Sequence, residues 1–313
     1  MAWPENESLD QARARNIADA LGEDLGTGDW TAMLVPDQRV QAQLVVREAA
    51  VLCGQDWFEG CIRTLDPQAH FNWVARDGDE LHAGQPVCSM TAQSRALLSA
   101  ERAALNFLQT LSATATQTAR YVSAIAGASP NPRGCVILDT RKTLPGLRQA
   151  QKYAVRMGGG ANQRLALWDG ILIKENHIAA AGGIPQALRA ARELLLSSAS
   201  GAGKASGANE EHESQGTISL QIEVETIEQL DEALRAGARS VLLDNFSLEG
   251  LREAVASAGA FAELMGEPPA LLEASGGLSL EQLRAVAQTG VDRISVGRLT
   301  KDITATDYSL RVV

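Results

Sequence analysis

The sequence has few aromatic residues, no excess of positive charge and no long apolar segment, and each shortage excludes a class of protein. Phe, Trp and Tyr make up 4% of the 313 residues, so aliphatic side chains must fill the core that a chain with 45% apolar residues can form. The formal net charge of −10 argues against a nucleic-acid partner, because phosphate backbones require a basic surface. No window reaches the ~18 apolar residues that a membrane-spanning helix needs, so we expect no membrane partner.

Cysteine is also scarce, and its four positions contain no C-x-x-C pair. We therefore expect reduced thiols in a soluble, cytoplasmic protein rather than a disulfide framework. Cys53 and Cys61 could bind a metal only with further ligands, and no second pair or histidine lies near them in the sequence. The first 26 residues carry acids and no apolar run, so we do not expect a signal peptide.

The first part of the chain predicts a mixture of helices and short strands. Residues 8–22 have the pattern of an amphipathic helix, and residues 40–54 alternate like a strand. Residues 70–90 predict two short strands around a turn at Asp77, Gly78 and Asp79. Residues 94–127 predict a long helical stretch that ends at Gly127.

Six short apolar segments later in the chain each predict a buried strand. They are VILDT (136–140), GILIK (170–174), LQIEVE (220–225), SVLLD (240–244), ALLEAS (270–275) and RISVG (293–297). Capped helices lie between them, with capping boxes expected at Thr226 with Gln229 and at Ser279 with Gln282. Repeated strand–helix units predict a parallel sheet, and six of them favour an incomplete (β/α) barrel, with a doubly wound sheet as the alternative.

This change of pattern predicts an α/β protein of two domains. We expect an N-terminal α/β domain with an open sheet over residues 1–127 and a catalytic (β/α) barrel over residues 128–300. A tail over residues 301–313 can return to the first domain. Residues 197–216 are rich in Ser, Gly, Ala and Glu without an apolar period, so we expect a flexible surface insertion in which His212 has no role.

Charged residues stand at the ends of these predicted strands. The cations are Arg141, Lys142, Arg164 and Lys174, and the acids are Glu223 and Asp244. The active site of a parallel barrel lies at the carboxyl ends of its strands, so we expect these side chains to line one pocket. Arginine forks and lysine ammonium groups bind carboxylates and phosphates, which predicts a substrate with several negative charges. The acids could hold Mg²⁺, bind ribose hydroxyls, or form structural ion pairs with the cations.

Glycine turns follow the last two predicted strands. They occur in ASGGLS (274–279) and SVGRLTKD (295–302), where backbone N–H groups could cradle a phosphate. The three glycines at 158–160 could form a similar cradle or a tight turn. Arg148, Lys152 and Arg156 recur at helical spacing and could form one helical face that is solvated or meets a partner.

Several of these motifs resemble one known family. DTRKTLPGLRQAQKYAVRMGGGANQR, LIKENH, IEVETIEQL, LLDNF and EASGGL are similar to those of nicotinate-nucleotide pyrophosphorylase, also called quinolinate phosphoribosyltransferase. ERAALNFLQTLSATAT and EDLGTGDWT resemble its N-terminal part. The resemblance implies a type II phosphoribosyltransferase fold. It also implies a homodimer with a shared active site and Mg²⁺-dependent conversion of quinolinate and phosphoribosyl pyrophosphate to nicotinate mononucleotide, pyrophosphate and CO₂.

The resemblance also implies roles for individual residues. Arg141 and Arg164 would hold the quinolinate carboxylates with Lys174 close by, and Arg102 would reach in from the other subunit. Lys142 and Lys174 would contact phosphoribosyl pyrophosphate or the developing charge. Glu223 and Asp244 would handle the ribose hydroxyls and the metal. The 5′-phosphate cradle would comprise Ser275, Gly276 and Gly297.

The chain departs from the family pattern at Gln163, where Asn-Gln-Arg replaces Asn-His-Arg. Glutamine donates hydrogen bonds but carries no charge, so we expect quinolinate binding with an altered pH dependence. Two alternatives remain open from the sequence alone. Lys174 could form a Schiff base in a lyase, or the chain could be a related accessory protein from a metal-transport context with an altered substrate.

Overall fold

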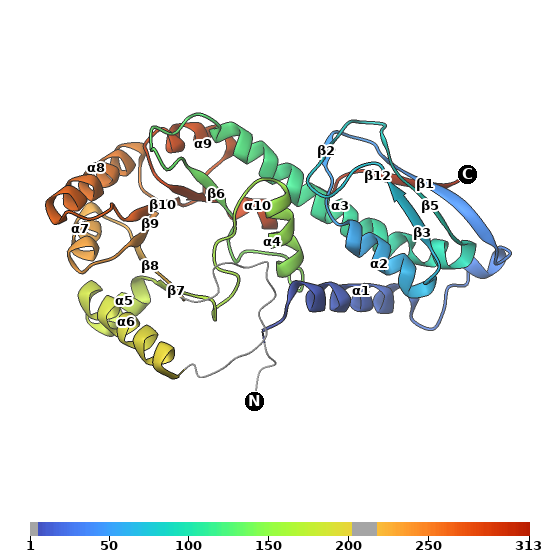
Figure 1. Ribbon diagram of the computed structural model, residues 1–313, viewed down its shortest axis with the longest axis horizontal. Coiled ribbons are helices and arrows are strands. Elements are labelled where there is room, and N and C mark those ends of the chain that lie inside the picture. Colours follow the sequence, from blue (N-terminus) through green and yellow to red (C-terminus); the bar gives the residue numbers. More distant parts are fainter. Residues whose placement is uncertain (1–5, 202–217) are drawn as a thin grey trace. The chain divides into compact units, whose positions relative to one another are not determined.

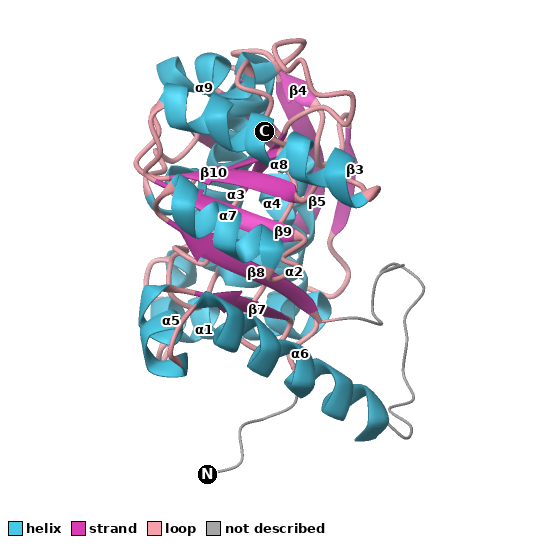
Figure 2. Ribbon diagram, turned by 90° about the vertical axis from the view of Figure 1, so that its left-hand side faces the viewer, coloured by secondary structure: helices cyan, strands magenta, loops and turns pink. Residues whose placement is uncertain are grey.

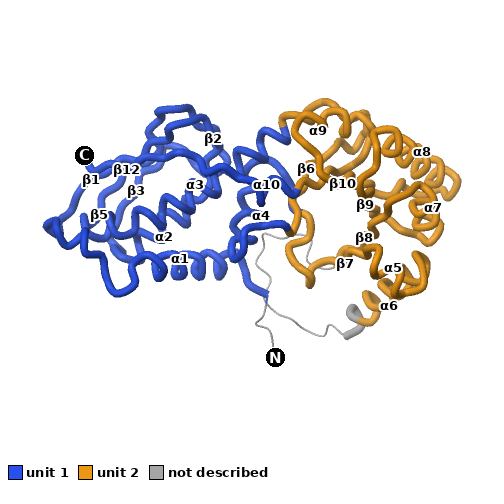
Figure 3. Tube along the Cα trace, turned by 180° about the vertical axis from the view of Figure 1, so that it is seen from behind, with its two compact units in different colours: residues 1–122, 142–162, 297–313 blue, residues 123–141, 163–296 orange. Residues whose placement is uncertain are grey.

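The chain folds into two compact units (Figure 3). The computed structural model describes residues 6–201 and 218–313. Unit 1 comprises residues 1–122, 142–162 and 297–313, and unit 2 comprises residues 123–141 and 163–296. The chain therefore leaves unit 1 within a long helix, returns to it once in the middle and returns again with its last strand.

Unit 1 is built on a four-stranded antiparallel sheet with the strand order β12-β1-β5-β3 (Figure 1). Its strands are β1 (Arg39–Val46), β3 (His70–Trp73), β5 (Pro86–Gln93) and β12 (Tyr308–Val312). A separate ladder joins β2 (Ala50–Val51) to β4 (Glu80–Leu81). The helices are α1 (Leu9–Leu25), η1 (Ala32–Leu34), α2 (Gln55–Leu65), most of α3 (Ser94–Ile125), α4 (Arg148–Met157) and α10 (Arg298–Lys301).

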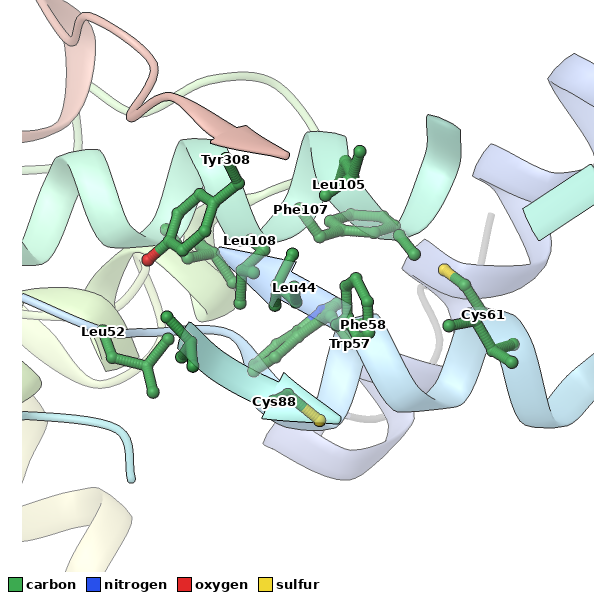
Figure 4. Close-up of a cluster of buried hydrophobic side chains, with 14 of the residues drawn as sticks. Leu44, Leu52, Trp57, Phe58, Cys61, Cys88, Leu105, Phe107, Leu108 and Tyr308 are labelled. Carbon is green, nitrogen blue, oxygen red and sulfur yellow. The ribbon is translucent and has the colours of Figure 1, made fainter. Parts of the chain in front are cut away.

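The scarce aromatic residues are concentrated in the core of unit 1 (Figure 4). Trp57 and Phe58 of α2 are almost fully buried, and the ring of Phe58 contacts Trp73 edge-on with 5.7 Å between ring centroids. Leu44 of β1 and Leu108 of α3 pack in the same cluster. In unit 2 the buried apolar side chains are aliphatic throughout its described residues, as the composition predicts.

Two segments belong to unit 1 that lie outside the predicted N-terminal domain of residues 1–127. The sequence pattern predicts residues 142–162 to belong to the barrel domain, but Ala150 and Ala154 of α4 are buried in the unit 1 core. Strand β12 pairs with β1 along its length, with Leu44 opposite Leu310, so the end of the chain completes the sheet of unit 1.

The strand prediction for residues 70–90 was incomplete, because the segment contains three strands rather than two. β3 and β5 pair with each other in the main sheet, with Phe71 opposite Met90. The short β4 between them pairs with β2 instead. The turn at Gly78 adopts a positive φ of 98°, as expected for glycine in a tight turn.

Unit 2 is a six-stranded parallel sheet with the strand order β6-β11-β10-β9-β8-β7. Its strands are β6 (Val136–Leu138), β7 (Gly170–Ile173), β8 (Ser219–Val224), β9 (Ser240–Asp244), β10 (Leu271–Ser275) and β11 (Arg293–Ser295). Its helices are α5 (Glu175–Ala181), α6 (Ile184–Gly201), α7 (Ile227–Arg235), α8 (Leu248–Met265) and α9 (Leu280–Ala287). Figure 2 shows β7 to β10 side by side, with α5, α7 and α8 over the outer face of the sheet.

The strand order shows that unit 2 is an incomplete barrel. The first strand, β6, pairs with the last, β11, and the others follow in chain order to β7. In a doubly wound sheet the chain would instead start with a strand in the middle, and the order of the strands would reverse there. Within the described residues no ladder joins β6 to β7, so the barrel stays open there. All six predicted strands are present, and the capping box of Ser279 with Gln282 forms at the start of α9.

Residues 197–201 complete α6, and the rest of the predicted insertion at 197–216, including His212, lies outside the described residues. Among the helices of the described ranges, none combines the length and the apolar character that crossing a bilayer requires.

Candidate active site

The side chains of alternate residues on the strands of unit 2 point into the barrel. Leu242 of β9 lies opposite both Glu223 of β8 and Glu273 of β10. Side chains of paired positions share a face of the sheet, and so do positions two residues apart. Gln221, Glu223, Asp244, Glu273 and Ser275 therefore belong to one face. The hydrogen bond between Gln221 and Glu273, on strands separated by β9, identifies this face as the barrel interior.

Lys174 and Glu223 form an ion pair between the ends of neighbouring strands. Lys174 Nζ lies 2.6 Å from Glu223 Oε2, and Glu223 is the more buried partner. Lys174 is the N-cap of α5, and its backbone N–H donates to His177 Nδ1 at 3.0 Å. The helix start thus fixes the backbone from which the lysine side chain extends, so the predicted cation and acid are brought together.

Arg141 and Arg164 both belong to unit 2, and Arg141 acts electrostatically on Arg164. Burial, followed by the positive charge of Arg141, lowers the pKa of the Arg164 guanidinium below its ordinary value. Glu223 acts on the same guanidinium in the opposite sense, which places it in the same electrostatic neighbourhood. Arg164 Nη1 donates to the carbonyl of Gly170 at 3.0 Å, which ties the arginine to the start of β7. Two neighbouring guanidinium groups favour the binding of an anion with more than one carboxylate.

Gln163 is anchored through both its backbone and its side chain. Its backbone N–H donates at 2.9 Å to Oδ1 of Asp139, which is fully buried after β6. Its side chain Nε2 donates at 3.0 Å to Gln221 Oε1. Gln221 in turn donates to the buried carboxyl of Glu273. The residue that departs from the family pattern is therefore linked through Gln221 to the buried carboxyl of Glu273.

The glycine turn after β10 is packed against the end of β9. Gly276 has a φ of +116°, and a Cβ at this position would come within 2.4 Å of Asn245 Oδ1. Asn245, with a φ of 57°, is the one residue other than glycine with a positive φ in the described parts of the chain. Its backbone N–H donates to the carbonyl of Ser275 at 3.0 Å. The close approach brings Ser275 and Gly276 beside Asp244.

Three other predicted site residues belong to unit 1. Arg102 is exposed on α3, and Lys142 is exposed in the segment before α4. Gly297 is the N-cap of α10. The hydroxyl of Thr300 in α10 donates to the carbonyl of Lys142 at 2.8 Å, so these two segments are held together within unit 1.

The remaining cations of residues 139–164 do not form one surface. Lys152 is 2% exposed, whereas Arg156 is exposed and donates to Asn162 Oδ1. The predicted helix is present, but a solvated face is not borne out at Lys152, because α4 buries its middle in unit 1. Gly158 at the end of α4 is required for close packing, since a Cβ there would lie 2.3 Å from the carbonyl oxygen of Ala115.

Sequence reasoning gave no role to Asn245, His177, Gln221 or Glu273. Asparagine directly after the strand end was a usable signal, because asparagine adopts the left-handed region more readily than most residues. Gln221 and Glu273 lie two positions before Glu223 and Ser275 on the same strands. Because side chains alternate along a strand, Gln221 and Glu273 lie on the same face of the sheet as the predicted site residues.

The acids of the site suit a metal that arrives with a phosphorylated substrate. Mg²⁺ in phosphoryl and pyrophosphate sites is held by one or two carboxylates together with substrate oxygens and water. Glu223 and Asp244 supply two such carboxylates on neighbouring strands. Within the described ranges no cluster of three or more His, Cys, Asp or Glu residues could hold a metal by itself, and Cys53 and Cys61 are free, buried thiols. The donor set fits Mg²⁺ shared with substrate rather than a closed structural site.

Known proteins resemble the chain over almost its whole length. The family model for the quinolinate phosphoribosyl transferase C-terminal domain matches residues 114–311, and that for the N-terminal domain matches residues 29–112. The probable nicotinate-nucleotide pyrophosphorylase [carboxylating] of Bacillus subtilis (strain 168) is 38% identical over 93% of this chain and 90% of its own length. The Mycobacterium leprae (strain TN) nicotinate-nucleotide pyrophosphorylase [carboxylating] is 39% identical over 94% of this chain and 95% of its own.

A solved structure shows the same architecture. The nicotinate-nucleotide pyrophosphorylase from Francisella tularensis superimposes with a TM-score of 0.84 at 38% identity, and the match covers 100% of both chains. The fold and the charged strand ends thus define a phosphoribosyltransferase of the barrel type. The chain belongs to the quinolinate phosphoribosyltransferase family, which confirms the resemblance seen in its motifs.

Proposed function

We propose that the charged strand ends of unit 2 form the centre at which this enzyme joins its two substrates. The chain is a nicotinate-nucleotide diphosphorylase (carboxylating), a pentosyltransferase of NAD biosynthesis. The family implies quinolinate and phosphoribosyl pyrophosphate as its substrates. The observation that carries the assignment of the site is the Lys174–Glu223 ion pair, with Arg141 and Glu223 both acting electrostatically on the Arg164 guanidinium.

The two arginines match the charge of a pyridine dicarboxylate. Arg141 and Arg164 bind the quinolinate carboxylates and orient the pyridine nitrogen toward the ribose, with Lys174 close by. Because the two cations lie near each other, a doubly charged ligand relieves a repulsion that is present in the free enzyme. Gln163 contacts quinolinate beside Arg164.

The sugar phosphate is held by the neighbouring strand ends. Ser275 and Gly276 bind the 5′-phosphate through backbone N–H groups, as the tight approach of Gly276 to Asn245 supports, and the family resemblance gives the same role to Gly297. Glu223 and Asp244 bind the ribose hydroxyls and would hold Mg²⁺. When bound, this ion supplies positive charge next to the pyrophosphate. The family resemblance gives Lys142 the role of contributing charge to this leaving group.

The reaction then needs no covalent intermediate with the protein. The pyridine nitrogen forms a bond to C1 of the ribose as the bond to pyrophosphate breaks and its electron pair leaves with pyrophosphate. When the carbon–carbon bond to the adjacent carboxylate breaks, its electron pair stays on the ring carbon, where the neighbouring positive charge of the pyridinium nitrogen stabilises it. CO₂ departs, and the ring carbon takes up a proton. The protein supplies orientation and fixed charge throughout.

We further propose that the enzyme is a homodimer in which Arg102 enters the partner's active site. Arg102 is exposed on α3, and unit 1 also exposes Trp30 and Leu34, each 81% accessible, which a second subunit would cover. The four free thiols suit a cytoplasmic location, where they would remain reduced.

Release of labelled CO₂ from carboxyl-labelled quinolinate tests the proposed reaction. We expect release only when phosphoribosyl pyrophosphate and Mg²⁺ are both present, and loss of release in the Arg141→Gln variant. Tight binding of another anion without turnover would favour the accessory protein instead. Mixing inactive Arg102→Ala and Lys174→Ala subunits tests the shared site, because random hybrids would regain about a quarter of the parent activity. No recovery after verified subunit exchange would exclude a contribution of Arg102 across the dimer.

A further inference from the structure

A chain of two amides and one carboxyl group crosses the interior of unit 2. Gln163 Nε2 donates to Gln221 Oε1 at 3.0 Å, and Gln221 Nε2 donates to Glu273 Oε2 at 2.9 Å. Gln221 lies on β8 and Glu273 on β10, with β9 between them. The link therefore spans the barrel interior and reaches a residue of the substrate site.

Glu273 sets the direction of every hydrogen bond in this chain. An ionised carboxylate only accepts hydrogen bonds, whereas a neutral carboxyl group accepts through its carbonyl oxygen and donates through its hydroxyl. Glu273 Oε2 accepts here, so Gln221 turns its NH₂ group toward Glu273 and its carbonyl oxygen toward Gln163. Gln163 must then offer its own NH₂ group to Gln221. A reversed amide at either position would bring two acceptors together.

Burial enforces this direction. Gln221 is 7% exposed and Glu273 is 1% exposed, so water is largely excluded from both groups. A wrongly turned amide would bury polar atoms without partners, which is costly in a low-dielectric interior. Burial also raises the pKa of Glu273, and a neutral carboxyl group still accepts from Gln221 through Oε2 when its proton is on Oε1.

We propose that Glu273 and Gln221 are positioning residues that fix the orientation of the Gln163 amide and thereby its contact with quinolinate. This inference rests on the proposed function of the site, in which Gln163 lies next to the carboxylate-binding Arg164. With one N–H of its NH₂ group directed at Gln221, Gln163 has the direction of its second N–H fixed as well, and this second N–H is the one that can donate to a carboxylate. A neutral histidine at this position could likewise donate from one ring nitrogen to Gln221 and turn its other nitrogen away.

Steady-state kinetics of near-isosteric variants test the hydrogen-bonded link from Gln163 through Gln221 to Glu273. We expect Gln221→Met and Glu273→Met to raise the KM for quinolinate three- to tenfold, in line with the loss of about one hydrogen bond, while kcat and the KM for phosphoribosyl pyrophosphate change less. Glu273→Gln keeps an acceptor oxygen and should retain a KM near that of the parent. Leu172→Met is the matched control, because Leu172 lies opposite Gln221 on β7 and makes no side-chain hydrogen bond.

A second measurement, by NMR spectroscopy, follows the orientation of the Gln163 side-chain amide in the absence of substrate. In protein labelled with ¹⁵N-glutamine, the side-chain NH₂ resonances of Gln163 are assigned by their loss in Gln163→Met. We expect them to shift in Gln221→Met and Glu273→Met but not in Leu172→Met. If the variants show these shifts but the parent does not turn over quinolinate, the proposed function fails while the positioning role of Gln221 and Glu273 stands.

Three results would overturn the inference. The first is an unchanged Gln163 resonance in Gln221→Met with the parent KM. The second is a Glu273→Gln variant as impaired as Glu273→Met, which would show that charge rather than acceptor geometry matters. The third is equal loss of kcat and of the affinity for both substrates, which would indicate a general structural defect. If the methionine variants do not fold, the comparison of Glu273→Gln with the parent still shows whether the charge of Glu273 or its acceptor geometry matters.

Discussion

Lys174 and Glu223 join the carboxyl ends of β7 and β8 through a contact of 2.6 Å between Nζ and Oε2. The lysine is 42% exposed and the glutamate 11%, so the pair faces the opening of the barrel rather than its floor. The glutamate thereby orients the ammonium group before substrate arrives. Substitution of either Lys174 or Glu223 is therefore expected to disturb the other.

Removal of the lysine should damage the chemical step more than folding. For Lys174→Ala we expect kcat/KM to fall by about 10²–10³-fold, the range seen when a fixed charge or donor is removed from a reacting centre. Glu223→Gln should show a smaller loss together with weaker binding of phosphoribosyl pyrophosphate. Arg235→Ala serves as the control, because its contact with Asp231 on the outer helix α7 is exposed. Equal activity of Lys174→Ala and the control would contradict the assignment.

Substitution of Arg164 by lysine should separate charge from geometry. Lysine keeps the positive charge but loses the planar fork that matches a carboxylate. We expect the KM for quinolinate to rise at least tenfold in Arg164→Lys, since charge-assisted hydrogen bonds contribute about 1.5–3 kcal/mol. The KM for phosphoribosyl pyrophosphate should stay within about twofold of the parent. An unchanged KM for quinolinate would show that the fork of Arg164 does not bind the substrate.

The glycine pair after β10 provides a matched comparison. Gly276→Ala should lower the free energy of unfolding by more than about 1 kcal/mol, because its φ is +116° and the new Cβ would meet Asn245. Gly277 has no atom near its Cβ position and no positive φ, so Gly277→Ala should leave stability unchanged. Urea unfolding of both variants checks this, and equal destabilisation would be inconsistent with the described turn. Gly276→Ala should also weaken binding of phosphoribosyl pyrophosphate.

Gln163→His should change how quinolinate binding depends on pH. The parent has no ionisable side chain at this position, whereas the unperturbed pKa of histidine is about 6.5. We expect kcat/KM of the variant to show an additional ionisation between about pH 5.5 and 7.5 that the parent lacks. Superimposable profiles of parent and variant would refute this expectation.

The buried carboxyl of Glu273 should make stability depend on pH. Burial raises its pKa from the ordinary value of 4.5, so the folded state holds the proton more tightly than the unfolded chain. Its contribution to the free energy of unfolding is therefore largest below 4.5 and falls as pH rises through the folded pKa. The slope is at most about 1.4 kcal/mol per pH unit. The difference between urea-unfolding curves of the parent and Glu273→Gln isolates this effect, and a constant difference from pH 4 to 8 would exclude it.

The sequence predicted the barrel well because its signals are local. Each apolar segment from VILDT to RISVG formed a strand, and Thr226 accepts a hydrogen bond from the backbone of Gln229 as its capping pattern predicts. Parallel strands bring their carboxyl ends to one edge, so Lys174, Glu223 and Asp244 could be grouped without coordinates.

Other features depend on packing that no local pattern encodes. Lys152 follows the spacing of Arg148 and Arg156, yet it is buried, because the side of α4 that faces the core is set by distant parts of unit 1. The bond from Gln221 to Glu273 depends on the curvature of the sheet, which brings together strands that are not neighbours. Periodicity assigns a residue to a face but does not identify its partner across the barrel.

The pairing of β12 with β1 has a consequence for biosynthesis. A ribosome releases β1 early, but its partner, Tyr308–Val312, only after every strand of unit 2. Until then one edge of the nascent sheet stays open to pairing with other chains. Unit 1 can therefore complete its sheet only after β11, the last strand of the barrel, has been synthesised.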